Sequence, residues 1–435
     1  MNLLAEKRTA KVAVVPQSEN QEPRRPKLVR ITARLTVSGV AQQVCMLHEN
    51  LAPNFETRLI IGSLAEGESD MSHLLSSEQN VLRLPQMSRE VSARTDFLAF
   101  WKILKFLRRE RPEIVHTHTA KAGALGRSAA WLAGVPIIVH TYHGHVFHSY
   151  FGALKNWIFL TIERILGRLS TRVIAVSESQ QHDLCSKYRV APREKFVVIE
   201  NGFKLERFSS LCREDARRQL GLSPDDFVVV WAGRMVPVKD TQLLAQVIRR
   251  AAEKQSKICF LILGDGTQRQ EFESLIRGYE NVRLFGWQHN MAPIWSAADL
   301  ALLTSRNEGT PTVLIEALAA GRPFVSTNVG GVRDLAVGDL QELPGNMGHR
   351  VANGYLASRT PESLLYCIEQ MANNPRIAKE MGSVGQSFAL QHFCEGRLLE
   401  QMSKLYQTLL MERPGNGYAA VKKSSKSVSQ NEDIA

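Results

Sequence analysis

The amino-acid sequence predicts an α/β protein with two Rossmann-like, doubly wound domains. Short apolar runs alternate with helical patterns from about Lys27 to Leu410, which is typical of a sheet covered by helices. Most of these runs are continuously apolar rather than alternating, as parallel strands with both faces covered usually are. A polar stretch from Leu205 to Asp226 interrupts the series once. A chain of 435 residues therefore has the length and pattern of two such domains.

Ten segments are expected to be strands because they are short, apolar and rich in β-branched residues. They are Leu28–Ala33, Arg58–Ile61, Ile114–His116, Ile137–Thr141, Val173–Val176, Val197–Glu200, Val228–Trp231, Cys259–Leu263, Val282–Phe285 and Leu300–Thr304. Helices are expected between them where apolar residues recur at helical spacing. The clearest are Thr95–Arg109, Ala122–Ala133, Trp157–Leu169, Thr241–Glu253 and Thr312–Ala320.

Polar stretches indicate where the domains begin and end. Residues 1–26 and 413–435 are expected to be mobile arms, because their polar composition cannot form a core. The turn residues Glu200-Asn201-Gly202 end the first strand series, and a second series begins at Phe227. We therefore expect a first domain over residues 27–202 and a second over residues 203–390, with ligand bound in the cleft between them.

Composition narrows the function without choosing it. Lys and Arg exceed Asp and Glu by 11, which favours anionic partners such as nucleotides, phospholipid surfaces or nucleic acid. The six cysteines form no Cys-x-x-Cys pair, so neither a disulfide framework nor a zinc knuckle is expected. The first residues lack the apolar region of a secretory signal, and no run is long enough to span a membrane. We expect a cytoplasmic protein.

In a doubly wound fold, functional residues follow the strands. The strand Val228–Trp231 leads to Gly233, Arg234 and Lys239. Gly233 permits a tight exit, and a guanidinium with an ammonium close by suits a diphosphate. The alternative is a pair of solvated surface charges. A further turn, Leu263-Gly264-Asp265-Gly266, lacks the third glycine of a dinucleotide fingerprint and is expected only to join a strand to a helix.

The strongest local signal follows the strand Leu300–Thr304. Pro311 is expected in the first turn of a helix that begins near Thr310, so that free backbone N–H groups face the cleft. Such a terminus binds phosphate readily. Glu308 precedes it and Glu316 lies in its second turn, so one carboxylate could bind a sugar and the other a ribose. The alternative is that Glu308 only complements the helix dipole.

Histidines follow two strands of the first half. His116 and His118 lie on one side of their strand, and Lys121 opens the next helix. Four more histidines fall within nine residues, at positions 140, 143, 145 and 148.

A metal site at these histidines is an alternative that we do not favour. The nearest acidic residue after His148 is Glu163, and the spacing matches no hydrolase metal motif. We expect His143 to donate a hydrogen bond to substrate, because Gly144 lets the backbone approach a ligand. The other histidines are expected to satisfy backbone groups.

Taken together, these residues resemble the retaining glycosyltransferases of family 4, also called glycosyltransferase group 1, which have the GT-B fold of two Rossmann-like domains. The resemblance covers the chain from about Lys27 to Leu410. Its most specific part is Glu308-x7-Glu316 within Asn307–Pro323. It is supported by Gly233-Arg234-x4-Lys239, Ala175-Val176-Ser177-Glu178-Ser179, Glu200-Asn201-Gly202 and Val329-Gly330-Gly331.

The resemblance implies roles for these residues. Arg234 and Lys239 would hold the nucleotide diphosphate and Glu308 the hydroxyls of the donor sugar. Glu316 would bind the ribose, and His143 would lie beside the transferring sugar and the acceptor. The other candidate substrate-binding residues are Gly39, His118, Lys121, Gly144, Gly233, Gly309, Thr310, Thr312 and Val313. No metal or cofactor is implied.

Two parts of the chain stand apart in this resemblance. Family members often have Gly-Gly after the first strand, whereas this chain has Ser38-Gly39-Val40-Ala41. Gly39 still lets that loop approach a diphosphate. The family pattern also implies that a C-terminal helix, within residues 391–412, packs back on the first domain.

The expected reaction is retaining transfer of a hexose from a nucleotide diphosphate sugar, favoured to be UDP-linked. The acceptor would be a hydroxyl of a glycan or lipid-linked substrate in cell-surface polysaccharide synthesis. No carboxylate is obviously placed as a nucleophile, so front-face attack is favoured, with the leaving phosphate taking the acceptor proton. Phe97–Arg109 and Tyr150–Arg172 mix aromatic and basic residues, which makes an anionic membrane surface a further expected partner. The alternative is that their apolar stripes are core.

Two other functions stay open. A nucleotide-sugar epimerase or hydrolase on the same fold would share the donor site and need no acceptor. A basic nucleic-acid-binding protein would use the positive charge. It ranks last, because the charge is spread along the chain and no RRM, zinc-finger or helix-turn-helix pattern is found.

Overall fold

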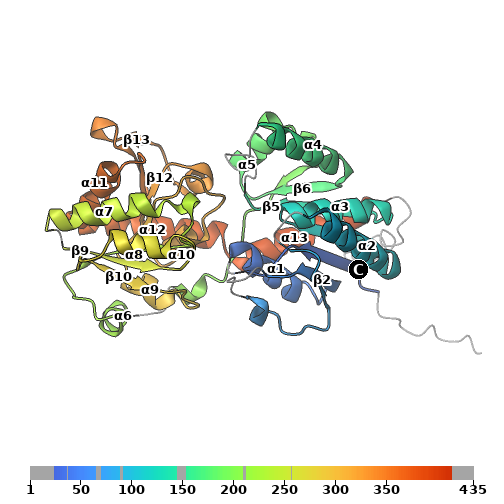
Figure 1. Cartoon of the computed structure of the whole chain (residues 1–435), viewed down its shortest axis with the longest axis horizontal. Coiled ribbons are helices and arrows are strands. Elements are labelled where there is room, and N and C mark those ends of the chain that lie inside the picture. The colour runs from blue at the N-terminus through green and yellow to red at the C-terminus, as the bar shows by residue number, and fades with distance from the viewer. Residues whose placement is uncertain are drawn as a thin grey trace, which may run out of the picture.

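The computed structural model confirms the predicted fold class (Figure 1). It describes residues 24–36, 38–64, 70–88, 92–144, 153–208, 212–255 and 257–413. Two sheets, one of seven and one of eight strands, lie in separate bodies that stand side by side. The predicted arms of residues 1–26 and 413–435 lie almost entirely outside the described residues. Among the described helices, none has both the length and the hydropathy of a membrane-spanning segment.

All strand pairs of the first sheet are parallel. Parallel neighbours need a crossover connection between one strand and the next. Its strand order is β3-β2-β1-β4-β5-β6-β7. The strands are β1 (Lys27–Thr32), β2 (Glu56–Gly62), β3 (Val81–Leu84), β4 (Ile114–His118), β5 (Ile137–Tyr142), β6 (Arg172–Ala175) and β7 (Phe196–Val198). Its helices are α1 (Gly39–Asn50), α2 (Ala93–Glu110), α3 (Ala120–Leu132), α4 (Ala153–Leu169) and α5 (Glu178–His182).

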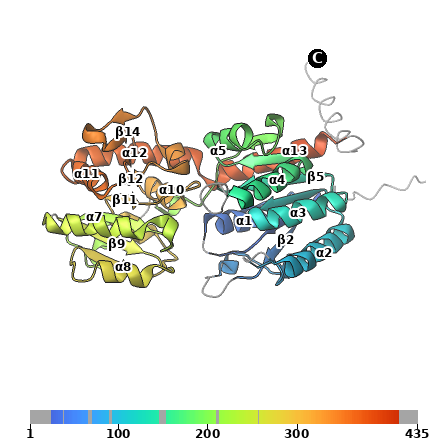
Figure 2. The same ribbon diagram turned by 45° about the horizontal axis from the view of Figure 1, so that its top comes forward.

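Alternate residues of β1 show which helices cover each face of this sheet. Leu28 packs with residues of α1 on one face. Val29 and Ile31 pack with residues of α2 and α3 on the other. Helix α4 lies next to α3 on that second face (Figure 2). The sheet is therefore covered on both faces, as its continuously apolar strands predict.

The second sheet has the order β10-β9-β8-β11-β12-β15-β14-β13, in which only β14 runs antiparallel to both of its neighbours, β13 and β15. Its strands are β8 (Phe227–Ala232), β9 (Ile258–Leu263), β10 (Val282–Phe285), β11 (Leu300–Leu303), β12 (Phe324–Thr327), β13 (Gln341–Glu342), β14 (Gly348–Val351) and β15 (Gly354–Ala357). Residues of α6 (Arg213–Gln219), α9 (Ala292–Ala297) and α10 (Thr312–Ala319) pack on one face. Residues of α7 (Thr241–Glu253), α8 (Arg269–Leu275) and α11 (Pro361–Ala372) pack on the other.

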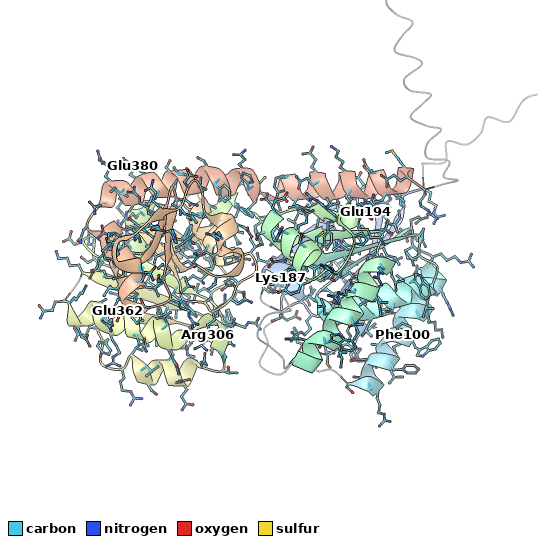
Figure 3. The ribbon with its side chains drawn as sticks, turned by 90° about the horizontal axis from the view of Figure 1, so that it is seen from above. Phe100, Lys187, Glu194, Arg306, Glu362 and Glu380 are labelled. Atoms are coloured by element: carbon cyan, nitrogen blue, oxygen red, sulfur yellow. The ribbon has the colours of Figure 1, made fainter. Side chains whose placement is uncertain are left out.

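The last two helices join the bodies. α12 (Pro375–His392) lies along the second sheet and α13 (Glu395–Met411) along the first, nearly in line with each other (Figure 3). Leu398, Met402 and Tyr406 of α13 belong to the core that β1 and α1 form, as the implied C-terminal crossover requires. Where the chain crosses back, Phe203 pairs with Cys394 in an isolated bridge. The domain limits at residues 202 and 390 remain a prediction.

One predicted element begins two residues later than expected. Pro311 is the N-cap of α10, with φ −72° and ψ 105°, and Thr312 is its first helical residue. The expected start near Thr310, with Pro311 in the first turn, is therefore wrong. The N–H groups of the first turn of α10, which have no partner within the helix, still point out of its N-terminus.

Because α13 completes the core of the first domain, shortening one of its buried side chains should destabilise that domain. We expect Met402→Ala, at a side chain 1 % exposed, to lower the free energy of unfolding by about 2–5 kcal/mol. Met411→Ala, at the 46 % exposed end of the same helix, is the matched control and should change little. Urea unfolding followed by circular dichroism measures both, and equal midpoints would contradict the assigned packing.

Candidate active site

In each sheet, the carboxyl ends of the parallel strands face the other domain across a cavity of about 360 Å³. Its walls come from α1 and residues 71–74 of the first body, from the hinge between Gly202 and Arg207, and from the ends of β8 and β9 and the start of α10 in the second. Ligands of doubly wound folds bind at this edge of the sheet. The cavity is the candidate site.

Lys239 and Glu308 form an ion pair beside this cavity. A 3₁₀ turn, Pro237–Lys239, follows β8 and places the Lys239 Nζ 2.6 Å from Glu308 Oε1. Ser305 Oγ donates a hydrogen bond to the same carboxylate oxygen at 2.5 Å. The Lys239 side chain is only 19 % exposed, so the simple reading of a solvated surface charge does not describe it. Arg234, by contrast, is exposed and forms no ion pair with another described residue.

The start of α10 meets the first domain at glycines. A Cβ atom on Gly309 would lie 2.7 Å from the His143 carbonyl oxygen and 3.2 Å from the Gly144 Cα. A Cβ atom on Gly39, the first residue of α1, would overlap the Thr312 hydroxyl. A side chain at position 309 would meet backbone atoms of the other domain, whereas one at position 39 would require the Thr312 side chain to move. The glycines therefore let the His143-Gly144 loop and the start of α1 touch the segment that begins α10.

His118 and His143 are brought together above the carboxyl end of the first sheet. His118 Nδ1 lies 2.9 Å from His143 Nε2, and the rings stack at 27°. Burial lowers the pKa of His143 to about 4 and that of His118 well below its ordinary value. Both rings are therefore neutral at pH 7. The buried Nε2 of His118 has no hydrogen-bond partner among the described residues.

The other described histidines of these strands are structural. His116 bonds the Tyr406 hydroxyl at 2.6 Å and the Thr141 hydroxyl at 2.7 Å. His140 bonds the Thr117 hydroxyl at 2.8 Å. Both partners of His116 are side-chain hydroxyls. His140 also forms a hydrogen bond to the backbone of Thr117, as expected for it. Within the part of the chain that the structure describes, no group of three potential ligands is arranged to hold a metal. His145 and His148 lie outside that part.

Glu316 is buried in the wall of the cavity. Its carboxylate lies 3.6 Å from an Arg207 guanidinium nitrogen and accepts a hydrogen bond from the Trp295 indole at 3.4 Å. Burial raises the pKa of Glu316 to about 7, although both partners act in the opposite direction. No sequence signal indicates Arg207, because its position depends on how the hinge crosses the cavity.

The candidate residues do not all reach the cavity. Gly39, Gly233, Thr312, Val313 and Glu316 line it. The lining does not include His118, His143, Gly144, Arg234, Lys239, Glu308, Gly309 or Thr310. Lys121 instead pairs with Asp96 of α2 at 2.5 Å, outside the lining. Gly264 does line the cavity, although its turn was expected only to join a strand to a helix. Thr310 lies beside Gly309 in the segment that precedes α10.

The raised pKa of Glu316 makes a stability prediction. The folded protein retains this proton up to about pH 7, whereas the unfolded chain releases it near pH 4.5. The unfolded state therefore binds fewer protons in this window, and stability falls as pH rises through it. We expect the wild type, relative to Glu316→Gln, to lose up to about 3 kcal/mol between pH 5 and 8. Thermal unfolding of both proteins without ligand measures this, and parallel pH profiles would contradict the buried position.

Known proteins are similar to this chain in sequence and in fold. The sequence pattern of Glycosyltransferase Family 4 matches residues 37–207, and that of Glycosyl transferases group 1 matches residues 226–374. The UDP-Gal:alpha-D-GlcNAc-diphosphoundecaprenol alpha-1,3-galactosyltransferase of Escherichia coli is 29 % identical over 313 residues, or 70 % of this chain and 80 % of that protein. A D-inositol 3-phosphate glycosyltransferase of Actinosynnema mirum is 30 % identical over 306 residues, or 58 % of this chain and 71 % of that protein.

Solved structures agree on the fold. The Anabaena HepE structure with UDP and glucose has a TM-score of 0.70 at 19 % identity and covers 88 % of this chain and 100 % of its own. Sucrose-phosphate synthase from Thermosynechococcus elongatus has a TM-score of 0.70 at 20 % identity, covering 89 % and 100 %. With both sequence patterns matched in order along two Rossmann-like domains, the chain belongs to the family 4, or group 1, glycosyltransferases and has the GT-B fold.

Proposed function

We propose that this glycosyltransferase moves a hexose, with retention, from a UDP-sugar to a hydroxyl of a glycan or lipid-linked acceptor in cell-surface polysaccharide synthesis. One observation carries the proposal. Glu308 of the Lys239–Glu308 pair lies four residues before α10, and the next residue, Gly309, touches the His143-Gly144 loop of the other domain. A cation, free N–H groups and a sugar-binding carboxylate therefore converge where the two domains meet.

The donor would bind by its diphosphate and its ribose. The Lys239 ammonium has three N–H donors, so it can keep Glu308 and still bind a phosphate oxygen. Arg234 is exposed on the same loop, next to Gly233, and is free to turn onto the diphosphate. Glu316, once ionised, would accept hydrogen bonds from the ribose hydroxyls in place of the Arg207 contact. No metal enters this account.

Transfer would proceed on one face of the sugar. The bond from the anomeric carbon to the diphosphate oxygen breaks while the acceptor oxygen bonds to the same face of that carbon. The acceptor proton passes to the departing phosphate oxygen. Lys239, Arg234 and the N–H groups of α10 stabilise the charge that grows on the diphosphate. Glu308 is already neutralised by Lys239, which makes it a poor nucleophile and suits it to holding sugar hydroxyls.

Relatives support the choice of donor and acceptor. The Escherichia coli relative is named for a UDP-galactose donor and a diphosphoundecaprenol-linked acceptor. A Staphylococcus aureus relative, CapM, is named for capsular polysaccharide biosynthesis and is 25 % identical over 355 residues. HepE was solved with UDP and with UDP-glucose.

Removing the cation at the site should reduce catalysis strongly. We expect Lys239→Ala to lower kcat/KM by about 2–4 kcal/mol of transition-state stabilisation, because the leaving diphosphate loses a charged donor. Lys254→Ala is the matched control, since Lys254 forms an ion pair with Glu369 at 2.8 Å on the exposed surface of the same domain. Initial rates with UDP-sugar and acceptor measure both. An unchanged kcat/KM in Lys239→Ala would defeat the assignment.

The stereochemistry of the product tests retention. We expect an α-linked UDP-sugar to give an α-linked product, because attack and departure share one face. Proton NMR of the new anomeric signal, recorded during turnover, reports this directly. A β-linked product, or a covalent glycosyl-enzyme trapped on any carboxylate, would overturn front-face transfer. Rapid turnover of UDP-sugar without acceptor would favour the hydrolase alternative instead.

A further inference from the structure

The exposed aromatic residues of the described chain gather on one side of the first domain. Trp101, Trp131 and Trp157 are 48 %, 55 % and 62 % exposed, whereas Trp231 and Trp295 are buried. Around the three exposed tryptophans lie further exposed apolar side chains of the same helices. We call the whole set the aromatic face: Phe97, Leu98 and Trp101 of α2, Trp131 and Leu132 of α3, and Trp157, Ile158, Ile162 and Ile165 of α4.

These exposed side chains are distinct from the residues of the same helices that form the core. On α2, Ala99, Ile103, Leu104 and Leu107 face the sheet and are buried. Leu98 and Trp101 lie on the side of the helix away from them, and Phe97 is exposed near the start of the helix. On α4, Trp157, Ile158, Ile162 and Ile165 recur at helical spacing and form one exposed stripe. The three helices lie side by side over the same sheet face (Figure 2). Among the described residues of the second domain, the exposed large apolar side chains are aliphatic only.

The charge on these helices is strongly positive. α2, α3 and α4 carry ten Lys and Arg against three acidic residues. All three acids already have a cation as partner: Asp96 pairs with Lys121, Glu163 with Arg127 and Glu110 with Lys27. The exposed cations are Arg94, Lys102, Lys105, Arg108, Arg109 and Arg168. The three helices therefore expose basic side chains together with tryptophans, and none of their acidic side chains is exposed.

The aromatic face adjoins the open edge of the first sheet. Because β3, β4 and β5 are parallel, the helix after each strand begins at the carboxyl edge, where His118 and His143 lie. Phe97 and Trp157 are each the fifth residue of their helices, so this apolar surface begins near that edge. It extends to Trp131 and Leu132 at the far end of α3.

We propose that the aromatic face docks the protein on an anionic lipid surface, with the tryptophans among the headgroups and the exposed Lys and Arg on lipid phosphates. Aromatic and basic side chains on one helical layer are the pattern of interfacial binding. A second copy of the chain would instead bring like charges together. The further step, that docking presents the head of a lipid-linked acceptor to the cleft, rests on the function proposed above; the docking does not.

Vesicle co-sedimentation tests this proposal. The full chain is mixed with vesicles of phosphatidylcholine and phosphatidylglycerol in equal parts, and with phosphatidylcholine alone, at low and high NaCl. We expect binding to the anionic vesicles that falls with salt, together with a blue shift of tryptophan emission. Trp101→Ser/Trp157→Ser should reduce this binding at least about tenfold. Leu275→Ser/Leu390→Ser, at exposed positions of the second domain, is the matched control and should bind as the wild type does.

The outcomes separate docking from the donor site. Wild type that stays in solution with anionic vesicles, or equal binding of all three proteins, would overturn the proposal. Equal binding to vesicles of phosphatidylcholine alone would overturn its anionic part. Self-association lost in the double tryptophan variant, without vesicle binding, would assign the face to a second copy instead. Thermal unfolding without UDP reports whether each variant is folded, and the shift that UDP causes reports donor binding. A wild type that binds vesicles but shows no shift with UDP would refute the proposed function alone.

Discussion

The ion pair between Lys239 and Glu308 is the interaction on which the candidate site depends. Lys239 follows β8 along the chain, and Glu308 lies between β11 and α10. The ion pair therefore joins the segments that follow these two strands. Because both groups are largely removed from water, loss of either leaves an uncompensated charge. Ser305 holds the same carboxylate oxygen, which restrains the pair from a second side. A ligand that enters therefore meets a cation and a carboxylate already oriented.

Close approach of the two domains is the second constraint. Gly309 touches the backbone of the His143-Gly144 loop, where a Cβ atom would overlap it, and Gly39 packs against the Thr312 side chain. The hinge and α13 set this approach, because Arg397 at the start of α13 donates to the carbonyl oxygens of Glu200 and Asn201 at 3.0 and 3.1 Å. The backbone that carries His143 is thus held against Gly309, the residue next to Glu308.

The fold was largely predictable because parallel strands covered on both faces have a distinctive apolar pattern. The strand that precedes Lys239 and the one that precedes Glu308 both form, and α7 has its predicted bounds. β3, β12 and the β13–β15 strands went unpredicted; β13 is an exposed pair of polar residues without that pattern. Within the site, the sequence could not distinguish the paired His118 and His143 from the structural His116 and His140. That distinction depends on Tyr406, which lies 290 residues from His116 along the chain. The pairing of Lys121 with Asp96 likewise depends on how α2 packs against α3.

The central claim is that the second domain binds a sugar donor through its diphosphate. Isothermal titration calorimetry tests this claim by comparing the affinity for UDP with the affinity for uridine, which lacks the diphosphate. Two or more charge-assisted contacts to phosphate predict that UDP binds at least on the order of a hundredfold more tightly than uridine. Equal affinities, or no measurable affinity for UDP, would contradict the account.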